Sequence, residues 1–127
     1  MQGMTSYKYA VIRIVPRVDR DEFINAGVIL YQAERGYLKA KTLIRDAQLK
    51  ALSSEIDTNT ISRHLKAFEL ICEGDSSAGP IARLSKSERF QWLTSPRSTI
   101  IQTSPVKAGV GAAPDTELKE LTNRLVA

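Results

Sequence analysis

Four charged side chains in this sequence are of the types that bind ligands or protein partners: Arg17, Glu22, Arg97 and Lys107. A guanidinium group offers a planar fork of N–H donors that fits a carboxylate or a phosphate, whereas a lysine acts as a point charge. Arg17 and Glu22 can form an ion pair that clamps a charged turn. Alternatively, Arg17 joins Arg97 in one cleft that binds phosphate or carboxylate, in which case we expect Arg97 to lie close to Arg17 and Glu22.

The residue types needed for most other chemistry are scarce. One cysteine, Cys72, excludes an internal disulfide and a cysteine-rich zinc site, and one histidine, His64, leaves little for a metal site or a catalytic triad. The hydroxyls of Ser98, Thr99 and Ser104 show no activating base in the sequence. We therefore expect no catalytic residue, no metal ion and no cofactor.

A short glycine motif, Gly109-Val110-Gly111, is the nearest approach to a phosphate-binding loop. A dinucleotide-binding fingerprint needs a third glycine and a following βαβ unit, and the sequence provides neither. Asp115 would also place a negative charge at the helix start where an anion should dock. We interpret residues 108–113 as a connector.

Positive charge is concentrated in one part of the chain. The net charge is +4, and residues 76–114 account for all of it, because five basic residues there face the single acid Glu88. The five are Arg83, Lys86, Arg89, Arg97 and Lys107. Such an excess attracts phosphate, nucleic acid or an acidic partner. An ordinary solvated face explains it as well, and we prefer that interpretation.

The elements that position these residues begin with a β-hairpin. Runs of β-branched and aromatic residues, bounded by proline and turn residues, predict strands over residues 7–15, 24–33, 37–43 and 98–103. Apolar spacing and capping signals predict helices over residues 44–52, from Asp57 to Gly74, from Ser85 to Ser95 and after Pro114. This order predicts an α+β fold: an antiparallel sheet of about four strands, with one strand returning late, covered by helices as a two-layer sandwich.

The length and hydropathy of the chain lead to three further expectations. A length of 127 residues predicts a single domain over residues 1–127, with a flexible start at 1–6 and an internal loop at 75–80. No run reaches the roughly 18 apolar residues that a membrane helix needs, and the polar start does not resemble a signal peptide. We therefore expect a cytoplasmic protein that does not enter the membrane.

Two blocks of the sequence resemble a known bacterial family, the domain of unknown function 3037 (DUF3037). The first block comprises Tyr7–Arg17 and Glu22–Leu30, and the more specific second block comprises Phe90–Leu93, Pro96–Gln102 and Ser104–Val106. The resemblance extends from about residue 7 to residue 126. Some members are associated with genes for HipA-like kinases, so the resemblance implies an accessory role beside a protein partner, and it supplies no catalytic residue.

One position departs from the family pattern. The resemblance implies a histidine after the Ser-Pro-Val step, where this sequence has Lys107. Lysine is a poor substitute for an acid–base histidine near pH 7, because its ordinary pKa is about 10.4. A role in binding would tolerate the replacement better.

Three functions remain open at this point. The first is a non-enzymatic accessory or interaction domain, with a HipA-like kinase as partner. The second is a small domain that binds nucleic acid or a phosphate ligand through the basic segment 76–114. The third, and the weakest, is an enzyme of unknown reaction.

Overall fold

The first three strands form an antiparallel meander, as their alternating apolar residues predict. In the computed structural model, which describes residues 4–126, these strands are β1 (Thr5–Ile14), β2 (Ile24–Gln32) and β3 (Tyr37–Thr42). β2 lies between β1 and β3 and is antiparallel to both. The expectation of an α+β fold with an antiparallel sheet is therefore confirmed, with five strands in place of about four.

The far edge of the sheet is made of two short strands that both pair with β1. β4 (Ile101–Thr103) pairs with the end of β1, and β5 (Lys107–Gly111) pairs with its beginning. Ser104 fills the gap between them. Its N–H donates to the carbonyl of Val11 at 2.8 Å, and its hydroxyl accepts from the N–H of Val11 at 2.9 Å. The buried Ser104 side chain thus replaces a missing backbone bond of the ladder.

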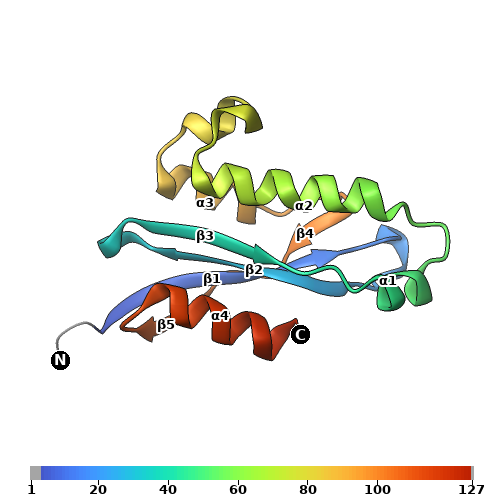
Figure 1. Cartoon of the computed structure of the whole chain (residues 1–127), viewed down its shortest axis with the longest axis horizontal. Helices are drawn as coiled ribbons and strands as arrows, with labels where there is room; N and C mark the ends of the chain where they lie inside the picture. Colours follow the sequence, from blue (N-terminus) through green and yellow to red (C-terminus); the bar gives the residue numbers. More distant parts are fainter. Residues whose placement is uncertain (1–3, 127) are drawn as a thin grey trace.

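Helices cover both faces of the sheet (Figure 1). One face packs against α1 (Asp46–Leu52), α2 (Thr58–Glu73) and α3 (Lys86–Thr94). The opposite face packs against α4 (Pro114–Leu125) through a smaller apolar cluster: Tyr7, Val28, Leu30, Leu118, Leu121 and Val126. The expected two-layer sandwich therefore has a third layer, because the central strands present apolar residues on both faces.

The helix boundaries follow the capping signals in the sequence. Asp57 accepts a hydrogen bond from the N–H of Asn59 at 3.0 Å and so caps the start of α2. Gly74, with a φ of 73°, ends α2 in the left-handed conformation that glycine adopts readily. Ser85 and Glu88 form a reciprocal capping box at the start of α3.

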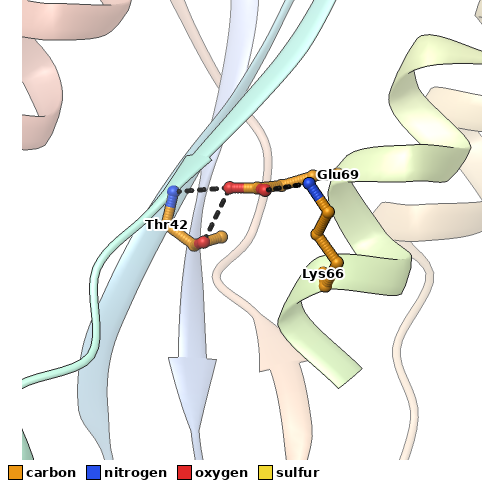
Figure 2. Close-up of polar contacts among 3 residues, drawn as sticks. All are labelled: Thr42, Lys66 and Glu69. Atoms are coloured by element: carbon orange, nitrogen blue, oxygen red, sulfur yellow. Dashed lines mark hydrogen bonds and ion pairs between the residues drawn. The ribbon is translucent and has the colours of Figure 1, made fainter. Parts of the chain in front are cut away.

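The β3 edge of the sheet is covered by charged side chains. The Glu69 carboxylate, from α2, accepts hydrogen bonds from the N–H and the hydroxyl of Thr42 at 3.2 and 2.7 Å, and Lys66 lies 4.0 Å from it (Figure 2). Lys39 and Lys41 are exposed along the same strand. Charged residues of this kind protect an edge strand from pairing with another chain.

Some expected boundaries are wrong. The expected connector at 108–113 is largely β5, and the expected strand at 98–103 is reduced to Ile101–Thr103. Within the expected loop at 75–80, the chain forms a 3-10 turn, η3 (Ser76–Ala78), and begins another, η4 (Pro80–Arg83). In the expected flexible start, residues 5 and 6 belong to β1, and residues 1–3 lie outside the described residues.

Candidate functional site

The charged turn after β1 does not contain the expected ion pair. Arg17 lies 3.6 Å from Asp19, and Glu22 lies 2.8 Å from Arg20. The expected pairing of Arg17 with Glu22 is therefore wrong. The reason is local: a 3-10 turn, η1 (Val18–Arg20), and the left-handed backbone of Asp21, with a φ of 56°, bring each arginine to the acid two residues further on. Both pairs are exposed, so they contribute little to stability.

Arg97 is held at the end of α3. Its Nη2 donates to the carbonyl oxygen of Trp92, and its Nε donates to the carbonyl oxygen of Ser95 at 3.3 Å. The guanidinium also lies 4.6 Å from the centre of the Trp92 ring, within the range of a cation–π interaction. These contacts use part of the donor capacity of Arg97, and its other N–H groups remain available to a ligand.

Two hollows meet at Arg97. The first, of about 260 Å³, is mainly apolar and lies between α2, α3 and the segment leading into β4; its wall includes Phe68, Ile71, Trp92, Leu93, Ile100 and Ile101. The second, of about 220 Å³, is polar and is lined by Arg13, Val15, Asp21, Glu22, Phe23 and Ser98. Arg97 and Gln102 line both. We refer to the two hollows and the residues that join them as the Arg97 groove.

Of the four residues expected to bind ligands or partners, two lie in this groove. Glu22 and Arg97 line the polar hollow, as their expected proximity requires. Arg17 instead lines a third hollow, which adjoins the apolar hollow at Ile100 and does not include Arg97. Lys107 is exposed on β5, opposite Tyr9 of β1, at the other end of the broken edge.

Arg13 takes the place expected for Arg17, and the sequence analysis missed it. It lies opposite Gln102 in the ladder between β1 and β4, and its guanidinium carbon lies 4.1 Å from the centre of the Phe23 ring. Its Nε is buried without a hydrogen-bond partner among the described residues. A register shift between Ile12 and Arg13 marks an irregularity of the kind that redirects a side chain. Its position as an arginine within the apolar run of β1 was the sequence feature that could have identified it as a candidate site residue.

The basic segment is only partly available for binding. Arg89 is 8% exposed, and its guanidinium donates to the carbonyl oxygens of Leu84 and Cys72 at 2.5 and 3.3 Å. Arg89 therefore stabilises the end of α2. With Arg97 also bound to main-chain carbonyls, two of the five positive charges of the segment 76–114 are engaged within the fold.

The cysteine and the histidine have different environments. Cys72 is 1% exposed, and burial raises the pKa of its thiol to about 12, so it remains protonated near neutral pH. Cys72 is therefore a free thiol packed within the apolar core. His64 is exposed and lines the apolar hollow. Within residues 4–126, no cluster of three potential metal ligands occurs, and no helix has the length and apolar composition to cross a membrane.

The fold and the groove together define an α+β protein with a five-stranded antiparallel sheet and a two-part hollow beside its broken edge. The family model described as "Protein of unknown function (DUF3037)" matches residues 9–126 of the 127 residues. The chain belongs to this family. Comparison with curated proteins and with solved structures finds no match.

Proposed function

We propose that this chain is a non-enzymatic interaction domain that binds a protein partner at the Arg97 groove. The partner would present a segment with an apolar side chain next to a carboxylate. The observation that supports this function is the meeting of an apolar and a polar hollow at the shared residues Arg97 and Gln102.

The apolar hollow has the size and lining of a pocket for side chains. Its volume of about 260 Å³ is below the roughly 300–1,000 Å³ typical of small-molecule sites. Trp92 is 40% exposed beside it and offers a large aromatic surface. Tryptophan and arginine are enriched among the residues that dominate binding energy at protein interfaces. One or two apolar side chains of a partner would fill this space.

The polar hollow supplies the complementary charge. Arg13 and Arg97 both line it, and Glu22 is paired with Arg20, which reduces its ability to neutralise them. The unpartnered Nε of Arg13 favours a ligand with acceptor oxygens. Asp21 also lines this hollow and would repel additional negative charge, so a single carboxylate fits better than a polyanion.

The association implied by the resemblance makes a HipA-like kinase the first partner to test, and we propose that the two proteins meet in the cytoplasm. A nucleic-acid ligand has weaker support. Arg89 is buried and bound to carbonyl oxygens within the fold, so the basic segment offers fewer phosphate contacts than its composition indicates. Base stacking would depend on Trp92, since Phe90 is buried in the core.

Calorimetric titration with a purified HipA-like kinase from the same genome tests this proposal. We expect Arg97→Ala and Trp92→Ala each to weaken binding at least about ten-fold, the loss typical of residues that dominate an interface. Arg83→Ala is the matched control, because it removes an exposed arginine of the same basic segment outside the groove. Urea unfolding of each variant would check that the fold is intact.

Three results would contradict the proposal. Equal losses in Arg97→Ala and Arg83→Ala would indicate non-specific charge attraction. Absence of binding to the kinase would exclude this partner. Binding to single-stranded nucleic acid that weakens by orders of magnitude between low and moderate salt would favour the alternative function.

A further inference from the structure

The geometry points to a second interaction surface, the outer edge of β5, and we propose that it pairs with β5 of a second copy of this chain. The two strands would run antiparallel, with Gly109 of each copy facing the other across a two-fold axis. This surface is separate from the Arg97 groove, and the proposal does not depend on the function assigned to the groove.

The two edges of the sheet differ in how they are protected. The β3 edge carries two exposed lysines and the Glu69 carboxylate bound to its last residue. β5 pairs only with β1, and Lys107 is its sole charged residue. Val110 is 59% exposed, more than any other large apolar side chain described. An edge whose one charge lies at its first residue, and which has an exposed apolar residue, is a template for strand pairing.

The backbone directions define which groups of β5 face outward. Both backbone groups of Val11 bind Ser104, so they point toward the β4 and β5 side of β1. Directions alternate along a strand, so the odd-numbered residues of β1 point toward β5, and their β5 partners, including Gly109, point back. The outward N–H and C=O groups are therefore those of Ala108 and Val110.

These outward groups are self-complementary. When two copies meet antiparallel with Ala108 of one opposite Val110 of the other, both outward residues of each copy form hydrogen-bonded pairs. If the register between the two β5 strands shifts by two residues in either direction, only one hydrogen-bonded residue pair remains within β5. The same register places the apolar side chains of Ala108 and Val110 next to each other across the axis.

The opposite face of β5 supplies complementary charges in this register. Lys107 of one copy lies opposite Gly111 of the other. A Cβ on Gly111 would lie 2.5 Å from the Glu117 side chain, so this carboxylate is immediately beside the strand. Glu117 also accepts a hydrogen bond from the Tyr7 hydroxyl at 3.2 Å, which holds it in place. Each copy would thus bring Lys107 close to the Glu117 carboxylate of the other.

A strand pair of this length buries little surface, so we expect a dimer that forms only at high protein concentration. Sedimentation velocity up to about 1 mM protein tests this, since weak complexes dissociate in the millimolar range. We expect self-association of the wild type to be weakened at least about ten-fold by Val110→Lys. Leu43→Lys is the matched control, because Leu43 is 42% exposed just beyond β3, at the other edge.

Two further variants distinguish edge pairing of β5 from non-specific self-association. Ala108→Pro removes an outward N–H while leaving the bonds to β1, as an edge position allows, and should abolish the dimer. Glu117→Gln keeps an acceptor for Tyr7 but removes the charge opposite Lys107, and should weaken the dimer most at low salt. Thermal unfolding of each variant would confirm that the monomer remains folded.

Amide hydrogen exchange locates the contact directly. We expect the exchange of Ala108 and Val110 to slow as the protein concentration rises. The exchange of Leu38 and Ala40, whose N–H groups point outward on β3 as that of Thr42 does, should not change. A wild type that remains monomeric at all concentrations would overturn the proposal. So would a dimer that Val110→Lys and Ala108→Pro leave intact, or concentration-dependent protection on β3 rather than on β5.

Discussion

The hydroxyl of Ser104 connects the two halves of the broken sheet edge, and its removal should destabilise the fold measurably. Ser104 is 2% exposed, and its Oγ accepts the N–H of Val11 at 2.9 Å at the point where no strand pairs with β1. Val11 is itself 4% exposed, so water cannot easily replace the hydroxyl. Ser104→Ala would leave this N–H buried without a partner.

The expected cost follows from the desolvation of that donor. An unsatisfied buried backbone group costs about 1–3 kcal/mol. A domain of this size has a total stability of about 5–15 kcal/mol, so the effect is a substantial part of it. We expect the slope of the unfolding free energy against urea concentration to remain unchanged, because the surface exposed on unfolding hardly differs between wild type and Ser104→Ala.

Urea unfolding followed by tryptophan fluorescence would measure this difference. Ser98→Ala is the control, since Ser98 is exposed and its replacement should change stability by less than about 0.5 kcal/mol. Amide exchange at Val11 should accelerate in Ser104→Ala. If Ser104→Ala is as stable as Ser98→Ala, the hydroxyl of Ser104 does not hold the edge of the sheet.

Three other variants test the remaining parts of the fold. Arg89→Met should cost about 1–3 kcal/mol in urea unfolding, because it leaves the carbonyls of Leu84 and Cys72 without their donor; an unchanged midpoint would contradict this. Glu69→Ala should cost about 1–2 kcal/mol and should speed amide exchange at Thr42, whose N–H it releases. Burial raises the pKa of the Cys72 thiol from 9.0 to about 12. The unfolded thiol then loses its proton first as pH rises, so the unfolding free energy should fall from about pH 9 upward, and less steeply in Cys72→Ala.

Local signals predicted much of the architecture. Asp57 and Gly74 bracket α2 as caps, and Ser85 with Glu88 starts α3, because these residues satisfy helix ends through contacts within a few residues. The apolar alternation likewise predicted the meander. Gly27 interrupts an otherwise apolar strand, a pattern typical of a close backbone approach, and a Cβ there would lie 2.6 Å from the carbonyl oxygen of Lys41.

The features that the sequence analysis missed depend on contacts between distant residues. β5 contains two glycines, which disfavour a strand by composition. Here they leave room for side chains from other elements, because a Cβ would lie 2.5 Å from the Tyr7 side chain at Gly109 and 2.5 Å from the Glu117 side chain at Gly111. α4 was assigned to the same layer as the other helices, since the cluster that holds it on the opposite face contains residues from both ends of the chain.

The candidate site was predicted only in part, because it too depends on contacts between distant residues. Glu22 and Arg97 share a hollow because antiparallel pairing brings the end of β1 close to the start of β4. Arg17 lines a different hollow, beside Asp57 and Ile61 at the start of α2, and no local pattern in the sequence indicated this contact between distant segments. Arg13 occupies the hollow instead.

Amide chemical-shift mapping would show whether a protein partner binds at the Arg97 groove. The labelled chain would be titrated with the unlabelled HipA-like kinase, and the shifts would be followed along residues 4–126. We predict that the largest changes fall at residues 92–103 and around Arg13, with little change on α4. Changes confined to α4, or to β3, would contradict binding at the Arg97 groove.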